Sequence, residues 1–420
     1  MTGAGPGFYG WRVVGAAFVL AVFGWGAGFY GPPIYLHAVR EAHGFSLPLV
    51  SAAVTAHFLF GALVVANLPR LYRRFGVAAM TKAGALCLAA GVSGWAFAAH
   101  PWQLFLATLL SGAGWAAMSA AAINAIISPW FVRRRPAALA TAYNGASIGG
   151  VIFSPLFVAA ISAFGFPLAA ALTGIVMVVC VWILAEVYFS RTPEEMAQSP
   201  DGDALGTAGD SVTSVHARAL PGALLWRDPK FITLAAAMAL GLFAQVGLFA
   251  HLFSLLVPPI GAQWAGIAMG GATAAAVAGR TLVGWLMPIG ADRRLVACAS
   301  YAVQIAGSIV FVVAAGTNIP LLILGVILFG AGIGNATSLP PLIAQAEFVK
   351  EDVPRVVPLI VAISQASFAF APVMFGLIRE FVPQGHGGSA GAAPALFVAA
   401  ALIQALAIAA FLTGRRQRPQ

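Results

Sequence analysis

Residues 263–288 read QWAGIAMGGATAAAVAGRTLVGWLMP, an apolar run in which the only charged side chain is Arg280. A helix needs about 20 predominantly apolar residues to cross the hydrocarbon core of a bilayer, and this run is longer. Its arginine is therefore predicted to lie inside the membrane. A guanidinium does not lose its proton to escape that environment, and placing it near the bilayer centre costs about 2.5–3.5 kcal/mol on insertion scales. A chain that carries such a cost is expected to use the charge.

The composition of the whole chain agrees with this run. Of its 420 residues 60% are hydrophobic and 8% are charged, and the mean hydropathy is +0.91. Soluble domains carry roughly 25% charged residues, so we expect an all-α membrane protein with twelve spanning helices. The expected spans are 11–36, 46–71, 77–99, 102–130, 137–164, 167–189, 229–256, 263–288, 294–315, 319–346, 355–379 and 392–413.

The basic residues indicate the orientation. If the N-terminus starts in the cytoplasm and the spans alternate, nearly all Lys and Arg fall in cytoplasmic segments; the exceptions are Arg40 and Arg379 outside and Arg280 within the membrane. This is the positive-inside pattern. It predicts an inner-membrane protein with both termini in the cytoplasm and no cleaved signal peptide. The net charge of +9 then indicates contact with anionic membrane lipids rather than nucleic acid.

A polar stretch rich in Asp, Gly, Ser and Thr divides the chain, and we interpret residues 191–228 as a flexible cytoplasmic linker. It separates a six-helix bundle at 1–190 from a second at 229–420. The two halves share a weak echo, because Gly112-Ala113-Gly114 lies in the fourth span and Gly330-Ala331-Gly332 lies in the tenth. Two related six-helix halves are the arrangement of the major facilitator superfamily.

Several segments point to a subgroup of that superfamily. Residues 130–140 (WFVRRRPAALA), followed by spaced glycines through Gly150, resemble the loop and fifth helix of monocarboxylate-type and oxalate/formate-type carriers. The entry Tyr9–Val14 (YGWRVV) and the pairs His251-Leu252 and Gly279-Arg280 are similar to that group as well. The resemblance implies that Arg280 contacts the carboxylate of the substrate.

The chain also departs from the family pattern at two places. The loop between the second and third helices usually reads Gly-x-Leu-x-Asp-Arg-x-Gly, whereas residues 69–76 here read PRLYRRFG. Monocarboxylate carriers often place an aspartate one turn before the eighth-helix arginine, where this chain has Ala276. We therefore do not assume that this chain shares the coupling mechanism of these relatives.

The charge census gives an electrostatic argument that is independent of the resemblance. Outside Glu186, which lies near a helix end, the predicted spans contain no Asp or Glu, so the natural counter-ion of Arg280 is an anionic substrate. The alternative is a structural arginine that backbone carbonyls satisfy near a kink. Thr273 and Ala276 share the face of Arg280 because they precede it by seven and four residues. Since both are small, we expect that face to leave room for a ligand.

Neutral polar and aromatic residues complete the candidate site. His57 and His251 are candidates for proton coupling, because histidine titrates near neutral pH; either could instead be a neutral histidine bonded to a neighbouring helix. The remaining candidates for substrate binding lie at similar depth on other spans, where each could equally serve packing: Tyr30, Trp115, Asn144, Gln245, Asn335 and Gln365.

The sequence therefore predicts a secondary active transporter of a small organic anion, in the first place a monocarboxylate, that works by alternating access. Coupling would be to a proton or to a counter-transported anion. We find no catalytic, metal-binding or nucleotide-binding motif, and Cys87, Cys180 and Cys298 fall within predicted spans, so we expect no enzyme activity, cofactor, metal or disulfide, and a monomer. The first alternative is an efflux carrier for amphipathic drugs or other xenobiotics. The second is a membrane sensor or scaffold that does not transport.

Overall fold

The computed structural model describes residues 7–202, 222–288, 291–349, 351–382 and 392–415. Within these ranges the chain is helical with short connections and contains no strand. Eleven of the described helices are long and apolar enough to span a membrane. One of them, at Arg135–Phe189, has 55 residues and would measure about 80 Å, more than twice the thickness of the hydrocarbon core. It turns at Gly165, whose φ is +76°. This turn divides it into the fifth and sixth spans, so the expectation of twelve spans is confirmed.

The chain forms two compact units. Unit 1 comprises Met1–Phe45 with Ala56–Val212, and unit 2 comprises Ser46–Thr55 with Thr213–Gln420. The helix at Leu47–Phe75 therefore contributes its first residues to unit 2 and the rest to unit 1. Within unit 2, the hydroxyl of Thr55 accepts the backbone N–H of Val373 at 3.2 Å.

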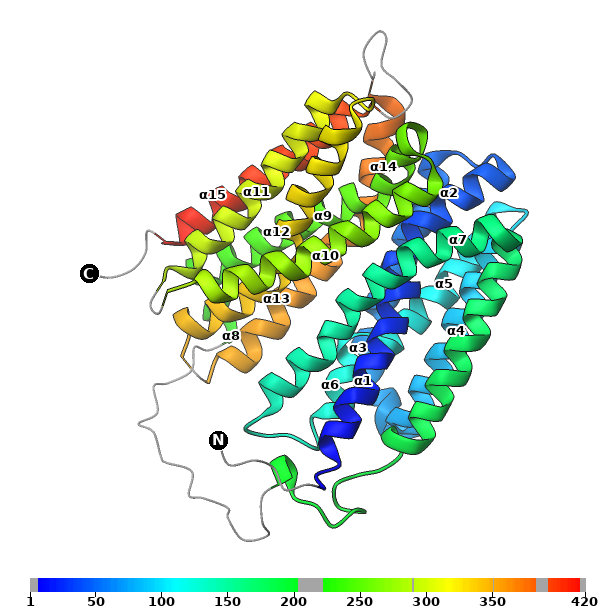
Figure 1. The fold of residues 1–420 in the computed structure, drawn as a ribbon. Helices are drawn as coiled ribbons and strands as arrows, with labels where there is room; N and C mark the ends of the chain where they lie inside the picture. Colours follow the sequence, from blue (N-terminus) through cyan, green and yellow to red (C-terminus); the bar gives the residue numbers. More distant parts are fainter. Residues whose placement is uncertain (1–6, 203–221, 289–290, 350, 383–391, 416–420) are drawn as a thin grey trace. The chain divides into compact units, whose positions relative to one another are not determined.

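Unit 1 is built around its longest helix, α7, whose two halves have different partners. A Cβ added at Gly145 would overlap the carbonyl oxygen of Phe18 in α1, and one at Gly174 would contact Ala89 in α4. Thus α1 packs on the first half of α7 and α4 on the second (Figure 1). The elements of unit 1 are α1 (Gly10–Trp25), the π-helix η1 (Gly26–Tyr30), α2 (Pro32–His43), the main part of α3 (Leu47–Phe75), α4 (Val77–Phe97), α5 (Pro101–Met118), α6 (Ala120–Ile127), α7 (Arg135–Leu184), the π-helix η2 (Ala185–Phe189) and the 3-10 turn η3 (Pro200–Gly202).

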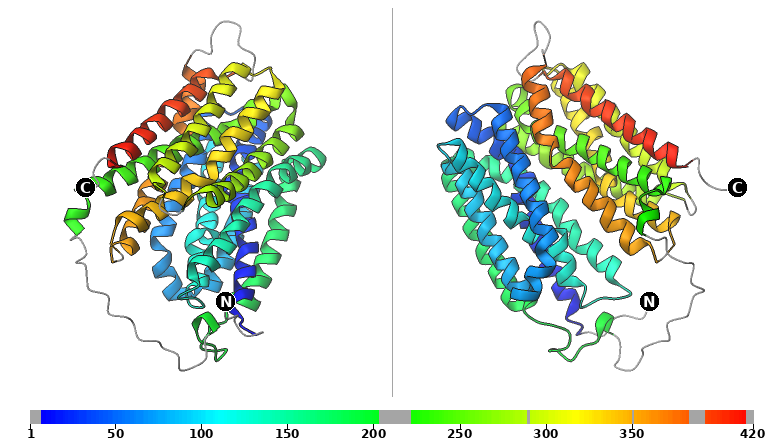
Figure 2. Two further views of the ribbon diagram at one scale, coloured as in Figure 1. Left: turned by 60° about the vertical axis from the view of Figure 1, so that its left-hand side comes forward. Right: turned by 180° about the vertical axis from the view of Figure 1, so that it is seen from behind.

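Unit 2 places α9 at the centre of its packing, in contact with α13 and α15; both views in Figure 2 show α15 alongside α9. Several of its helices begin at a side-chain cap: Asp228 accepts the N–H of Lys230, Asp292 that of Arg294, and Asn318 that of Leu321. Such caps contribute about 1 kcal/mol each. The helices of unit 2 are α8 (Gly222–Leu225), α9 (Pro229–Ile260), α10 (Ala262–Leu286), α11 (Arg293–Ala314), α12 (Ile319–Glu347), α13 (Val353–Phe368), α14 (Ala371–Phe381) and α15 (Pro394–Arg415).

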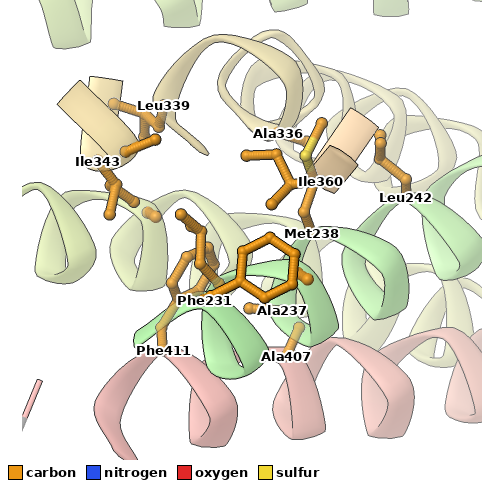
Figure 3. Packing of buried hydrophobic residues seen from close by; sticks show 14 of the residues in the cluster. Phe231, Ala237, Met238, Leu242, Ala336, Leu339, Ile343, Ile360, Ala407 and Phe411 are labelled. Atoms are coloured by element: carbon orange, nitrogen blue, oxygen red, sulfur yellow. The ribbon is translucent and has the colours of Figure 1, made fainter. Parts of the chain in front are cut away.

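A hydrophobic cluster joins several of these helices, among them α9, α12, α13 and α15. Phe231 and Met238 of α9 meet Ile343 of α12, Ile360 of α13 and Phe411 of α15 (Figure 3). All five side chains are buried to 2% exposure or less. Because lipid is as apolar as these side chains, this contact is stabilised by close packing rather than by exclusion of water.

The Gly-Ala-Gly motif that occurs in both halves of the sequence serves the same close helix packing in both units. In unit 1, a Cβ at Gly112 would overlap the carbonyl oxygen of His57 in α3, and one at Gly114 would overlap the backbone of Leu88 in α4. In unit 2, Gly330 meets the Ala272 carbonyl of α10, and Gly332 meets α11 in the same way. The fourth and tenth spans thus use the same pair of glycines to approach two neighbouring helices at once.

Three spans are interrupted in ways that hydropathy does not show. The first passes through η1 and then Pro32 before it continues as α2, and the eleventh breaks between Phe368 and Ala371, just before Pro372. Proline accounts for these two sites, since it lacks a donor and disfavours helix in the residue before it. The fourth span breaks at Ser119, which has an extended conformation and donates its hydroxyl to Ala116.

The structure corrects part of what the sequence predicted for the linker. Residues 191–228 were expected to be flexible, but Thr192–Gly202 forms turns, ends in η3 and makes hydrogen bonds to the N-terminal segment and to the loop before α7. Residues 203–221 of the predicted linker lie outside the described residues. The described chain begins again at Gly222, the first residue of α8.

Candidate substrate site

Arg280 lies on α10 and is half-buried. Its Nε donates a hydrogen bond of 2.9 Å to the carbonyl oxygen of Gly334 on α12. The close approach of the two helices permits this bond, because a Cβ at Gly334 would overlap the Ala276 carbonyl and lie 3.1 Å from the Cβ of Arg280. Ser338 donates its hydroxyl to the same Gly334 oxygen at 3.0 Å. The Gly334 carbonyl therefore orients the guanidinium from its Nε side.

The face of α10 that precedes Arg280 does not leave the room expected for a ligand. Ala276 is buried because Gly334 packs directly on its carbonyl. Thr273 is also buried, and its hydroxyl donates back to Met269 of its own helix at 3.2 Å. The expectation of an open, small face was wrong because small residues also let helices approach closely, and α12 fills the space.

The amides of unit 2 fall in three different environments. Asn335 is 3% exposed and lies beside Ser300 and Tyr301 of α11 and Phe411 of α15, in a place too narrow to hold a water molecule. Gln245 is 6% exposed, and within the described chain its Oε1 is buried without a hydrogen-bond partner. Gln365 on α13 is half-buried. A buried amide atom without a partner is costly inside a membrane, which makes Gln245 the strongest ligand candidate of the three.

In unit 1, the aromatic candidates belong to one cluster. Tyr30 packs edge-on against Phe29, with ring centroids 5.2 Å apart, and Phe29 stacks on Trp115 at 6.3 Å. Phe58 meets Trp115 edge-on at 5.4 Å. The sequence analysis predicted Tyr30 and Trp115 but missed Phe29 and Phe58. In a chain so rich in phenylalanine, nothing in the sequence distinguishes these two from the others.

Trp115 is 5% exposed, and its indole nitrogen is buried without a hydrogen-bond partner among the described residues. Gly28 and Gly61 make room for the ring, since a Cβ at either would approach it too closely. An unsatisfied indole donor is unusual in a packed interior. Asn144, by contrast, lies on an exposed position of α7, and the structure does not bring it to this cluster.

His57 is 1% exposed and has a partner at each ring nitrogen. Its Nε2 lies 2.9 Å from the carbonyl oxygen of Gly28 in η1, and its Nδ1 lies 2.8 Å from the hydroxyl of Ser111 in α5. The carbonyl only accepts, so Nε2 carries the proton and, in the neutral ring, Nδ1 accepts from Ser111. Trp95 donates its indole N–H to the same hydroxyl at 3.2 Å. His57 thus ties α3 to η1 and α5.

His251 is fully buried in unit 2. Its Nε2 lies 2.9 Å from the carbonyl oxygen of Pro372, at the start of α14. This carbonyl follows the break between α13 and α14. Both histidines bond to a carbonyl at or near a helix interruption, His57 at η1 and His251 near the break between α13 and α14. Interrupted helices leave backbone groups free for neighbouring side chains. The sequence could have indicated these partners only through such interruptions.

Among the described residues, no group of three or more His, Cys, Asp or Glu side chains is placed to hold a metal ion. The three cysteines are free thiols.

The comparison with protein families decides the broad identity. Residues 16–372 match the Major Facilitator Superfamily. The chain belongs to this superfamily. A search of curated protein sequences finds no match.

Solved structures of this superfamily share the fold. A mutant of the nucleoside transporter NupG aligns with a TM-score of 0.72 and 13% identity, covering 97% of this chain and 99% of that one. A bacterial homologue of the human lysosomal transporter Spinster, described as inward-facing and unoccupied, aligns with a TM-score of 0.68 and 17% identity, covering 99% and 98%. At such identities the likeness shows the fold alone. The chain is thus a multi-pass membrane transporter of the major facilitator type.

Proposed function

We propose that this protein is a secondary active transporter of a small organic anion, in the first place a monocarboxylate, and that Arg280 binds the carboxylate. The observation that carries the proposal is a guanidinium placed within a membrane span, half-exposed and oriented by the Gly334 carbonyl at its Nε. Guanidinium groups pair with carboxylates through two parallel N–H···O bonds. An anion bound there would offset the cost of holding the charge in the membrane.

Three carboxylates near the ends of the spans have basic partners. Glu347 is held by Arg294, Glu186 by Lys82 and Asp292 by Arg415. Their charges are thus used within the protein framework. Gln245, also in unit 2, would supply a polar contact to the rest of the ligand, because its Oε1 is buried without a partner in the described chain.

For coupling, the arrangement of His57 favours a structural role, since both of its ring nitrogens are bonded. Proton coupling would then rest on His251, and anion exchange at Arg280 is the alternative. One uptake measurement distinguishes proton coupling from anion exchange. Uptake driven by external acidification that weakens in His251→Ala supports proton coupling, whereas uptake that depends only on internal anion supports exchange.

We also propose that the protein lies in the inner membrane as a monomer, with both termini in the cytoplasm. The distribution of the basic residues supports this orientation. Protease cleavage of a C-terminal tag in inside-out vesicles but not in right-side-out vesicles is the expected result, and the opposite pattern would contradict it.

Counterflow in proteoliposomes tests the substrate class. Labelled lactate and oxalate are compared with a nucleoside, because one fold neighbour is a nucleoside transporter, and with a neutral amphipathic drug. We expect anion counterflow in the wild type, its loss in Arg280→Ala, and normal counterflow in the control Arg415→Ala. Anion transport by Arg280→Ala at the wild-type rate would contradict the assignment.

A second candidate is efflux of amphipathic drugs, which the aromatic cluster of Phe29, Tyr30, Phe58 and Trp115 supports. Aromatic rings bind varied apolar ligands with little geometric demand. In this case the neutral drug is transported, its transport persists in Arg280→Ala, and it weakens in Trp115→Ala. The same assay therefore separates the two candidates.

A further inference from the structure

The segment that follows the sixth span folds back onto the N-terminal segment. The side chain of Gln198 bridges two backbone groups there: its Oε1 accepts the N–H of Tyr9 at 3.0 Å, and its Nε2 donates to the carbonyl of Gly7 at 3.1 Å. Tyr9 in turn donates its hydroxyl to the carbonyl of Val187 in η2 at 2.7 Å. The N-terminal segment is thus bonded to the end of the sixth span and to the polar segment after it.

Three residues further on, Asp201 makes a denser set of bonds. Although aspartate is rarely buried, Asp201 is 3% exposed. Its carboxylate accepts the backbone N–H groups of Val132, Arg133 and Arg134 at 3.2, 2.8 and 3.1 Å. Its own N–H donates to the carbonyl of Trp130 at 2.9 Å. The carboxylate and the loop therefore hold each other by four hydrogen bonds.

This loop leads directly into α7, which begins at Arg135. Arg134 at the N-cap position provides no side-chain cap. Asp201 places a negative charge and two acceptor oxygens beside the backbone N–H groups that lead into the helix, where anions are stabilised. A residue 66 positions after the start of α7 thus holds the loop that leads into this helix, through N–H groups that precede its first turn.

An apolar cover excludes water from this contact. The ring of Phe8 packs on Gly202 and lies edge-on to Trp130 and Phe131, with centroids 6.3 and 5.4 Å apart. Gly202 has a φ of +73°, which L side chains rarely adopt. Exclusion of water strengthens the hydrogen bonds to the Asp201 carboxylate.

We propose that Thr192–Gly202 forms a strap, anchored by Asp201, that fastens the linker to the N-terminal segment and to residues 130–134, and so fixes the position from which α7 starts. Its consequence for transport is that α1, the start of α7 and the first part of the linker move together. The strap is a conformational device that does not depend on which substrate is carried.

The charge state of the anchor agrees with this role. Burial opposes ionisation of the Asp201 carboxyl, but the N–H groups of Arg133, Arg134 and Val132 and the Arg133 guanidinium outweigh it and lower the pKa below its ordinary value. The ionised carboxylate is therefore favoured, and the anchor stays engaged at neutral pH.

Hydrogen exchange followed by mass spectrometry tests the strap without any substrate. The variant is Asp201→Ala, and the matched control is Glu194→Gln, which removes a negative charge from the exposed part of the same segment. We expect exchange at the amides of Val132, Arg133 and Arg134 to rise on the order of tenfold in Asp201→Ala. Exchange in Glu194→Gln should match the wild type.

The decisive signal is the amide of Tyr9, which is bonded to Gln198 and not to Asp201. If the strap acts as one piece, exchange at Tyr9 rises in Asp201→Ala as well. A rise confined to residues 132–134 would overturn the proposal, as would wild-type protection throughout. Should Asp201→Ala fold poorly, Asp201→Asn keeps the shape and removes the charge, and it is expected to raise exchange at both places by a smaller factor.

Discussion

Two arginines of unit 2 show opposite ways of holding a guanidinium in a helical membrane protein. Arg294 is 1% exposed. Its bonds run to both carboxylate oxygens of Glu347, to the hydroxyl of Thr233 and to the carbonyls of Lys230 and Phe411. These five bonds match its five N–H donors. Arg280 is half-buried, and its Nε bond runs to a neutral backbone carbonyl.

Under the proposed function, the difference is one between an arginine of the framework and an arginine that binds substrate. The charge of Arg294 is neutralised by Glu347 at the ends of α11 and α12, so the pair fixes four helices together. The Gly334 carbonyl orients Arg280, and the side chain stays half-exposed. An oriented and partly accessible guanidinium is suited to meet an anion that arrives and leaves. The following changes test this division.

The largest effect on stability is expected for Arg294→Ala. The change leaves Glu347 without its partner in a largely buried position, and breaking such a pair costs about 3–5 kcal/mol. Thermal unfolding of the purified protein in detergent should show a strong loss, with poor expression. If Arg294→Ala unfolded at the same temperature as Arg280→Ala, the contrast between the two arginines would disappear.

Gly334→Ala is expected to be next. The added methyl group would overlap the Ala276 carbonyl, so α10 and α12 must separate, at a cost of about 1–3 kcal/mol. Because the Gly334 carbonyl also orients Arg280, transport should fall more than stability. Gly271→Ala on α10 is the control, since a Cβ there meets nothing within 4 Å. Equal behaviour of the two variants would show that the close approach at Gly334 is unimportant.

His57→Ala extends the comparison to a neutral side chain whose two ring nitrogens are both hydrogen-bonded within the protein. It removes the bonds to Gly28 and Ser111, and interhelical hydrogen bonds in membranes contribute about 1 kcal/mol each. We expect a modest loss of thermal stability, with the pH dependence of counterflow unchanged. A folded His57→Ala protein that had lost its pH dependence would instead identify His57 as the proton carrier.

The smallest effect is expected for Arg415→Ala. Arg415 pairs with Asp292 at 2.6 Å but is 46% exposed, and exposed ion pairs contribute about 0–1 kcal/mol. Thermal unfolding should be nearly unchanged, and the effect of high salt should be small. A loss as large as that of Arg294→Ala would show that burial does not distinguish these pairs.

The sequence predicted the parts of this molecule that depend on local pattern. Length and hydropathy located the spans, because a bilayer imposes one solution on long apolar runs. Arg280 stood out because a charge is costly there. The fold class therefore followed from the chain without any knowledge of contacts.

The missing parts depend on contacts between distant segments. Nothing local marks Gly334 as the acceptor for Arg280 or Gly28 as the acceptor for His57. Ala276 was expected to leave space, but only the position of α12 shows that the space is filled. Asp201 looked like one more polar residue of a linker, and its role appears only when its carboxylate is seen at the N–H groups of residues 132–134.

The central claim is that Arg280 binds a carboxylate. It is tested most directly by thermal unfolding of the purified wild type and Arg280→Gln in the presence of lactate or its neutral counterpart lactamide. At about 100 times its Kd, a ligand that binds only the folded protein adds about 2.7 kcal/mol. We predict that lactate raises the unfolding temperature of the wild type, that lactamide does not, and that Arg280→Gln responds to neither. Equal stabilisation of both proteins by lactate would contradict the claim.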